Sequence, residues 1–384
     1  MLDILVPVEK DRWALVCPRM TRSLRREVLQ EMAFCAYVAS GAGVDIRHFH
    51  AMTLNKKYVR GNTLDHGELW KMTGVTSEVS LLLPEIPEQL KILEDILKEK
   101  EPPELSLVPW MDRSHPCVLG SSCYAPMKED ISSLYGLSSG RTRAILGMGI
   151  RRIGQVPNRM LNSRQKIQKE AGIRGIPYAD KEALRGFLSN VREPVAALDF
   201  EAYAPDIPLF PGDRSASPVV FQYALAQGTG QNRRVHQYLH RSPDDPRPAL
   251  VKDLAENLPD RGSILVYGQS FERSRMRELA AAWPDFREIL MDAENRMVDL
   301  LPVFSGFLCY HPDQKGRCSL KKVLPAWLSR TYDRLMISAG GDVQELYPEM
   351  LDPATPQERR EEIYRGLLQY CRQDALGLLE LWEK

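Results

Sequence analysis

The feature that most constrains this chain is a predicted strand with two acids, between Pro194 and Tyr203. The stretch reads Pro-Val-Ala-Ala-Leu-Asp-Phe-Glu-Ala-Tyr, so an apolar run leads into Asp199 and Glu201. Residues two apart on a strand point to the same face, so these two carboxylates are expected side by side. Such carboxylates repel each other, and a hard divalent ion such as Mg²⁺ relieves the repulsion. The spacing alone also fits an edge strand with two solvated acids.

Bulk composition sets limits on the class of protein but does not point to a function. The chain has 384 residues, enough for about two domains, and 43% of them are hydrophobic, which supports packed cores. Because 51 basic residues balance 51 acidic ones, any attraction to nucleic acid must be local. No apolar run approaches the roughly 20 residues of a membrane span, and no signal-peptide pattern opens the chain. Seven cysteines without a CxxC motif favour a reducing compartment. We therefore expect a cytoplasmic protein that does not interact with membranes.

The C-terminal part, residues 191–384, is predicted to place strands and helices in a fixed order. Three strands come first and form an antiparallel meander, with a glycine turn between the second and the third. A helix, a buried strand and a second helix follow, and a long helix closes the chain. The expected ranges are 194–203, 219–227 and 234–240 for the meander, 248–257 for the helix, 263–267 for the buried strand, 270 onward for the second helix, an apolar segment at 296–307, and helices at 319–328 and 356–383.

Further acidic and phenolic positions extend the pattern of the first strand. Glu272 follows Phe271 where the second helix begins, and Tyr370 lies four residues before Asp374, on one helix face. In this order, Asp-x-Glu, Glu272 and Tyr-x-x-x-Asp resemble the motifs of DnaQ-like 3'-5' exonucleases of the DEDD group, in the variant with a tyrosine in the third motif. Ser319-Leu-Lys-Lys-Val-Leu also resembles a helix found in that group between the second and third motifs. The resemblance implies a ribonuclease H-like fold, a mixed sheet flanked by helices.

The resemblance also implies a chemistry for these residues. Asp199, Glu201, Glu272 and Asp374 would hold two Mg²⁺ or Mn²⁺ ions, and Tyr370 would orient or help deprotonate the attacking water. The reaction would release nucleoside monophosphates from the 3' end of DNA or RNA.

Several residues around this motif set carry secondary expectations. Glu272 stands where aspartate is usual, so we expect it to bind through water or to change the metal spacing. As isolated features, Glu272 also fits an acid favoured by a helix N-terminus, and Tyr370 fits a half-buried aromatic. Two aromatic residues, Tyr203 and Phe271, are expected near the terminal base. Weaker candidates are Asp299, as an acid that helps to hold the fold or the substrate edge, and His311 with Lys315, as phosphate contacts.

In the N-terminal part, residues 1–105, Asp3 lies on a first predicted strand, Cys17 and Arg19 end the second, and Cys35 lies on the helix that follows. This pattern resembles a degenerate RecB-type PD-(D/E)XK nuclease module of the α/β restriction-endonuclease-like class. Asp3 stands at the first motif position, and Cys17 and Arg19 replace the Glu and Lys of Glu-x-Lys, while Cys35 stands where a Gln is usual. Arg19 keeps a positive charge for a phosphate, but a metal-binding carboxylate is missing. The resemblance therefore implies a truncated fold remnant rather than an active nuclease. The expected elements are strands near 3–8, 13–17 and 46–54 and helices at 22–40 and 87–99.

The middle part, residues 106–190, is predicted to be a basic helical connector. Only two cysteines, Cys117 and Cys123, occur where related nucleases have several, so no iron–sulfur cluster is expected. Residues 134–157 read as a helix, a glycine-rich turn and a second helix. From Arg141 to Arg174 there are nine Lys or Arg against one acid. This segment, including Arg141, Arg143, Arg151 and Arg152, either contacts a phosphate backbone or forms a solvated basic face.

Two functional classes remain open from the sequence. The first is a metal-dependent 3'-5' exonuclease whose partner is a nucleic acid with a free 3' end. The second is a catalytically weak or inactive nucleic-acid-binding scaffold with protein partners in a bacterial defence or DNA-processing complex. The lost acid near Cys17 favours the second class, and the retained acids with Tyr370 and Asp374 favour the first.

Overall fold

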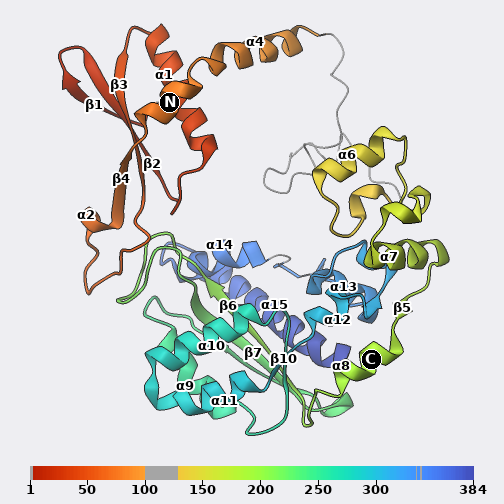
Figure 1. Ribbon diagram of the computed structural model, residues 1–384. Coiled ribbons are helices and arrows are strands. Elements are labelled where there is room, and N and C mark those ends of the chain that lie inside the picture. The colour runs from red at the N-terminus through yellow and green to blue at the C-terminus, as the bar shows by residue number, and fades with distance from the viewer. Residues whose placement is uncertain (1–2, 100–128, 334, 338–339) are drawn as a thin grey trace. The chain divides into compact units, whose positions relative to one another are not determined.

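The chain is a mixed α/β protein (Figure 1). The computed structural model describes residues 3–99, 129–333, 335–337 and 340–384. It divides into two compact units, Met1–Leu105 with Ala204–Pro218, and Ser106–Tyr203 with Val219–Lys384. Cys117 and Cys123, on which the iron–sulfur expectation rests, lie outside the described residues. Within the described ranges, no helix has both the length and the apolar character that crossing a membrane requires.

A five-stranded mixed sheet is the centre of the larger unit. Its strands lie in the order β10-β9-β6-β7-β8. β6, β7 and β8 pair antiparallel in sequence, as the predicted meander requires, whereas β9 pairs parallel with β6 and β10 parallel with β9. The bounds are β6 Ala196–Tyr203, β7 Val219–Gln227, β8 Arg234–Leu239, β9 Ile264–Val266 and β10 Met297–Asp299.

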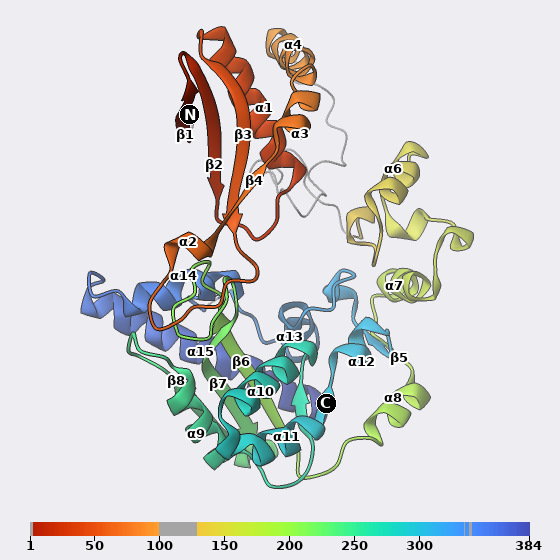
Figure 2. The ribbon, with the colours of Figure 1, turned by 60° about the vertical axis from the view of Figure 1, so that its left-hand side comes forward.

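Helices cover both faces of this sheet (Figures 1 and 2). On one face, α9 (Arg247–Asn257), α10 (Ser270–Ala282) and α11 (Arg287–Asn295) pack on alternate residues of β6, among them Leu198 and Phe200. The other face of β6 carries Asp199 and Glu201 and is covered by the long helix α15 (Gln357–Glu383). The period of two along β6 thus separates a fully apolar face from the face that holds the acids.

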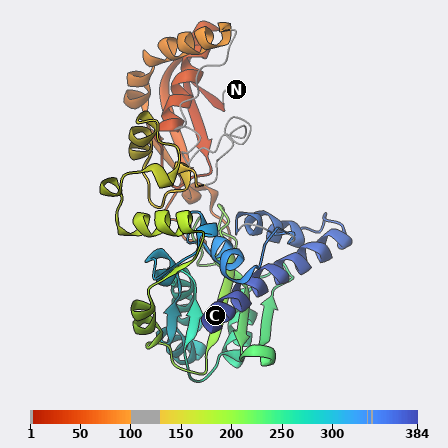
Figure 3. The ribbon, with the colours of Figure 1, turned by 90° about the vertical axis from the view of Figure 1, so that its right-hand side faces the viewer.

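Three further helices lie near the acid-bearing face. The apolar segment expected at 296–307 is divided between β10 and α12 (Leu301–Ser305). α13 (Leu320–Leu328) packs against α15, and Gly377 makes this close approach possible, because a Cβ there would lie 2.5 Å from Leu324 Cδ1. α14 (Gly340–Leu351), which the sequence patterns did not predict, lies beside α15 (blue in Figure 3).

The basic segment of the middle part is less helical than expected. α6 (Ser139–Gly147) forms, but the predicted second helix is replaced by a single 3-10 turn, η3 (Ile153–Gln155). Gly149 has a left-handed φ of +74°, and the backbone of Arg152 then pairs with Asp130, so the chain turns away from a helical path. α7 (Ser163–Arg174) and α8 (Lys181–Leu188) follow, joined by β5 (Tyr178–Ala179), which pairs with β11 (Cys309–Tyr310).

The smaller unit contains a four-stranded sheet in the order β1-β2-β3-β4. β2 and β3 pair parallel, and the outer pairs are antiparallel. Leu15 of β2 and Phe49 of β3 pack against Met32 of α1 and Val79 of α3 to form its core. The sequence patterns missed β4 and α3. The bounds are β1 Ile4–Glu9, β2 Arg12–Arg19, α1 Arg26–Gly41, β3 Asp45–Leu54, α2 His66–Leu69, β4 Trp70–Gly74, α3 Thr76–Leu82 and α4 Glu85–Lys98.

Candidate metal centre

Three carboxylates from two elements meet on one face of the five-stranded sheet. Asp199 and Glu201 come from β6, and Asp374 comes from α15; one oxygen of each lies within 4.8 Å of the others. Oδ2 of Asp199 is buried and has no hydrogen-bond partner in the described structure. A buried acceptor without a donor, next to two other carboxylates, fits a hard divalent cation with oxygen ligands.

Hydrogen bonds from the sheet to α15 fix the third carboxylate in place. Gln222 Nε2 of β7 donates to the carbonyl oxygen of Leu367 at 2.8 Å, and Gln237 Nε2 of β8 donates to that of Leu368 at 2.7 Å. The Cys371 thiol donates to the backbone oxygen of Asp199 at 3.5 Å. These bonds hold one side of α15 against the sheet, and Asp374 lies one turn after Cys371 on that side.

Without a bound metal ion, the surroundings of the three acids raise their pKa values and favour their protonated forms. Burial and the neighbouring carboxylates of Asp374 and Glu201 raise the pKa of Asp199 well above its ordinary value. Burial and the carboxylates of Asp374 and Glu272 raise the pKa of Glu201 to about 8, although the positive charge of Lys321 opposes the rise. Burial raises the pKa of Asp374 to about 6, although hydrogen bonds from Tyr332 and Tyr370 oppose the rise. A divalent cation would reverse this preference, because it stabilises the ionised carboxylates.

Glu272 lies near the three-acid cluster but outside its tightest group. It is in the first turn of α10 and is buried, and its Oε2 has no hydrogen-bond partner in the described structure. Burial raises its pKa to about 7, and its charge contributes to the raised pKa values of Asp199 and Glu201. The charge of Glu272 therefore acts on the cluster, but its carboxylate is not among the three that lie within 4.8 Å of one another.

Asp299 holds the chain segment that delivers Glu272. Its carboxylate accepts hydrogen bonds from the backbone N–H groups of Gly268 at 2.8 Å, Gln269 at 3.1 Å and Leu301 at 2.9 Å. Gly268 has a left-handed φ of +82°, which a glycine adopts without strain. Asp299 thus fixes the turn between β9 and α10, the fold-holding role that its position in the sequence suggested.

Two tyrosines and a lysine border the acids. Tyr370, predicted as a site residue, is 4% exposed, and its ring centroid lies 6.1 Å from that of Tyr332. The Tyr332 hydroxyl donates to Oδ1 of Asp374, a contact that sequence reasoning missed. Lys321 Nζ, on α13, lies 4.8 Å from the Tyr370 ring centroid and 5.8 Å from that of Tyr332. The Ser-Leu-Lys pattern was the one available signal for Lys321, and Tyr332 had no comparable motif.

The two aromatic residues expected to contact a base differ in exposure. Phe271 is 36% exposed, and the Arg275 guanidinium lies 5.1 Å from its ring centroid. Tyr203, in contrast, is buried against Phe221 and Tyr347, with ring centroids at 6.1 and 5.1 Å. The buried ring of Tyr203 offers little surface to a base, so its packing is that of a core residue, whereas Phe271 remains available for stacking.

The basic residues of the middle part are exposed. Arg141 and Arg143 lie on α6, and Arg151 and Arg152 lie between α6 and η3. The Arg141 guanidinium donates to the carbonyl oxygen of Met160 at 2.5 Å, so part of its hydrogen-bonding capacity serves the local fold. Their contact with nucleic acid remains a prediction.

In the smaller unit, the position of Arg19 differs from the expectation of a free positive charge. Its guanidinium lies 2.8 Å from Asp3 Oδ2 and 2.7 Å from Glu31 Oε1. Hydrogen bonds from Cys17 and Arg19 outweigh burial and lower the pKa of Asp3, while burial and Asp3 raise the pKa of Cys17 to about 12. Two carboxylates therefore balance the charge of Arg19, which corrects its proposed availability for a phosphate.

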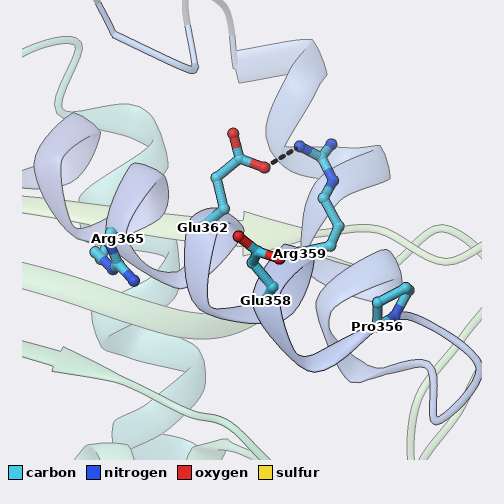
Figure 4. A pocket seen from close by; sticks show the side chains of 5 residues that line it. All are labelled: Pro356, Glu358, Arg359, Glu362 and Arg365. Atoms are coloured by element: carbon cyan, nitrogen blue, oxygen red, sulfur yellow. Dashed lines mark hydrogen bonds and ion pairs between the residues drawn. The ribbon is translucent and has the colours of Figure 1, made fainter.

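Two other surface features lie apart from the acids. A pocket at the start of α15 is lined by Pro356, Glu358, Arg359, Glu362 and Arg365 (Figure 4). Arg359 pairs there with Glu362 at 2.8 Å, and no residue of the three-acid cluster lines the pocket. His311 accepts a hydrogen bond from the Asp313 backbone N–H at 3.2 Å, a local capping contact that uses one of its ring nitrogens.

Comparison with known proteins adds one match. Residues 196–319 match a family described as Domain of unknown function (DUF2779). The match covers less than half of the 384 residues; it includes Asp199, Glu201 and Glu272 but ends before Tyr370 and Asp374. No curated protein and no solved structure matches the chain significantly.

Proposed function

We propose that this chain is a metal-dependent nuclease that removes nucleotides from the 3' end of a nucleic acid strand. The observation that carries the proposal is the convergence of Asp199, Glu201 and Asp374 beside the buried phenol of Tyr370. Carboxylates from a strand and a helix that share an oxygen-lined site are suited to hard divalent ions, which catalyse phosphoryl chemistry in proteins. The DnaQ-like exonuclease resemblance of the motifs supports the same class of reaction.

The order of the strands supports a ribonuclease H-like fold for the larger unit. The sequence predicts an antiparallel meander followed by a helix, a buried strand and a second helix in a mixed sheet, which is the element order of that fold. The sheet order β10-β9-β6-β7-β8, with its observed strand directions, agrees with that arrangement. We likewise propose that the smaller unit derives from a restriction-endonuclease-like module, in which Arg19 lies between Asp3 and Glu31.

Each residue of the site would have its own role in the proposed reaction. Asp199, Glu201 and Asp374 would hold Mg²⁺ or Mn²⁺, with Glu272 near enough to contribute. When bound, the cation would stabilise negative charge on the phosphate oxygens. Burial and the acids raise the pKa of Tyr370 far above its ordinary value, so without a cation the phenol is protonated. Tyr370 would orient the attacking water through its hydroxyl group, or help to deprotonate it once a bound cation offsets the charge of the acids.

Nucleic acid is the proposed partner, and the described surface offers two contact candidates. Phe271, exposed near Glu272, would stack on the terminal base. The exposed arginines of α6 and the following turn would contact the phosphate backbone. The competing function, a non-catalytic scaffold, is favoured by one observation, the ion pairing of Arg19 with both carboxylates in the smaller unit.

Digestion of labelled oligonucleotides tests the proposal. DNA and RNA strands labelled at the 5' or the 3' end are incubated with the protein and Mg²⁺ or Mn²⁺. We expect stepwise shortening from the 3' end and, for Asp199→Asn, a loss of at least about 100-fold in rate. Asp260→Asn, at an exposed acid, is the matched control and should keep full activity. If the protein binds every strand tightly and shortens none, the nuclease proposal is wrong and the non-catalytic scaffold is the better description.

A further inference from the structure

Lys321 holds an unusual position among the charged residues of the larger unit. It lies in the first turn of α13, is half-buried, and its ammonium group lies over the faces of Tyr370 and Tyr332, with Nζ 4.8 and 5.8 Å from the two ring centroids. Two aromatic faces attract a cation and restrict where its flexible stem can place it. The two rings therefore hold the ammonium group at the border of the three-acid cluster.

The ammonium group lies in the field of the acids without pairing with any of them. The carboxylates of Asp374, Glu201 and Asp342, and after them that of Asp199, act on Lys321 electrostatically. In the described part of the chain, however, Nζ of Lys321 has no carboxylate oxygen within 4.0 Å and no hydrogen-bond acceptor. In contrast, Arg330 binds Glu380 at 2.5 Å, close to the same helix. Three N–H donors on a partly desolvated cation call for an acceptor.

An anion that is not part of the chain can supply the missing hydrogen-bond acceptor for Lys321. The three carboxylates lie close to one another, and a divalent ion bound among them would neutralise most of their negative charge. They would then leave Lys321 without a counter-ion. The group that approaches such a centre during the proposed reaction is a phosphate, whose oxygens accept from several donors and carry charge. We propose that Lys321 binds a phosphoryl oxygen of the nucleotide at the metal centre, an inference that rests on the proposed nuclease function.

Lys321 would then act together with the two tyrosines. Tyr332 binds Asp374 through its hydroxyl group and faces Lys321 with its ring, so one side chain positions both a metal-binding acid and the phosphate-binding cation. Tyr370 contributes the closer aromatic face. This arrangement specifies the ligand class as a phosphate monoester or diester bound beside a divalent ion, with no requirement for a particular base.

Binding measurements on the full chain test the inference without reliance on turnover. The dissociation constants of Mn²⁺, and of thymidine 5'-monophosphate at saturating Mn²⁺, are measured by titration calorimetry for the wild type, Lys321→Met, Lys321→Arg and Lys322→Met. Lys322 is exposed on the same helix and is the matched control. We expect Lys321→Met to weaken nucleotide binding about tenfold or more while Mn²⁺ binding changes less than about twofold. Lys321→Arg should restore most of the nucleotide affinity.

Several outcomes would overturn the inference. Unchanged nucleotide binding by Lys321→Met would do so, as would absence of nucleotide binding by a wild type that binds Mn²⁺. Tighter Mn²⁺ binding with unchanged nucleotide binding would make Lys321 an internal counter-ion of the acids instead.

Oligonucleotide digestion by the wild type separates this inference from the proposed function. If the wild type shortens DNA and Lys321→Met shows the same KM, the nuclease proposal stands and the role of Lys321 falls. If no strand is shortened but nucleotide binding still depends on Lys321, the nuclease proposal falls and the phosphate site stands.

Discussion

Tyr332 is the residue whose role depends most on tertiary structure. Its hydroxyl group donates to Asp374, its ring faces Lys321, and the side chain is buried at 5% exposure. A hydrogen bond to a buried carboxylate stabilises the ionised form, which is the form that binds a metal. Tyr332 therefore positions Asp374 and keeps its pKa lower than burial alone would allow.

Replacing Tyr332 with phenylalanine should weaken metal binding in a pH-dependent way. Loss of the hydroxyl group raises the pKa of Asp374, so protons compete with Mn²⁺ up to a higher pH. We expect Mn²⁺ affinity near pH 6 to fall about three- to tenfold, with a smaller loss at pH 8. Calorimetric titrations across this range measure the effect, and Tyr364→Phe, which keeps a ring that packs on Arg241, is the control. Equal losses at both pH values would contradict the role assigned to the hydroxyl group.

At the scale of elements, the site is the junction of β6 and α15. β6 delivers two acids on one face through its period of two, and α15 delivers Asp374 one turn after Cys371, which binds the β6 backbone. Packing the helix on the strand forces three like charges into a buried space. Folding therefore raises the pKa of Glu201 to about 8 and that of Asp374 to about 6.

Because the junction of β6 and α15 buries three acids, we expect the metal-free protein to lose stability as pH rises. The folded acids hold protons that the unfolded chain has already released, so the free energy of unfolding falls between about pH 4 and 8, by several kcal/mol for the cluster. Mg²⁺ should raise the melting temperature at pH 8 and have little effect at pH 5. Thermal denaturation of the wild type, Asp199→Asn and Asp260→Asn measures this.

The Asp199→Asn variant gives the sharper comparison. It removes one charge from the cluster, so its metal-free melting temperature should exceed that of the wild type at pH 8 and respond weakly to Mg²⁺. Asp260→Asn should follow the wild type at every pH. A Mg²⁺ response that Asp199→Asn retains in full would locate metal binding elsewhere.

At the scale of the whole molecule, the two units are interleaved along the chain. The loop 204–218 leaves β6 directly after the acids, belongs to the smaller unit, and returns to β7. Within the smaller unit, Arg60 holds this loop: its side chain donates to the carbonyl oxygen of Pro208 at 2.9 Å, and its backbone binds Gly212 and Asp213. Among the described residues, the chain therefore passes between the units at 203–204 and 218–219.

Removing the Arg60 side chain should loosen the loop. Arg60→Ala keeps the two backbone contacts but loses the bond to Pro208, and we expect chymotrypsin to cleave after Leu209, which is exposed in this loop, several-fold faster. Lys56→Ala, at an exposed position in the same segment, is the control. Limited proteolysis followed by mass spectrometry gives the rates, and equal rates in both variants would remove Arg60 as the anchor.

The elements that could be predicted have strong local signals. The meander strands, the helix on 247–257 and the closing helix have clear apolar periodicity, and their bounds lie within a few residues of those expected. α14, α11, β4 and α3 were missed because their patterns are short or interrupted, as by Pro348 inside α14. The prediction of a second helix in the basic segment is wrong because the chain turns at Gly149 and the backbone of Arg152 pairs with that of Asp130.

Two relations follow from local periodicity alone: Asp199 and Glu201 share a strand face, and Tyr370 and Asp374 share a helix face. Long-range packing brings the two faces together, places Tyr332 and Lys321 beside them, and buries Tyr203 in the core. Those relations join residues far apart in the chain, and packing of α14 and α15 on the sheet and of α13 on α15 sets them.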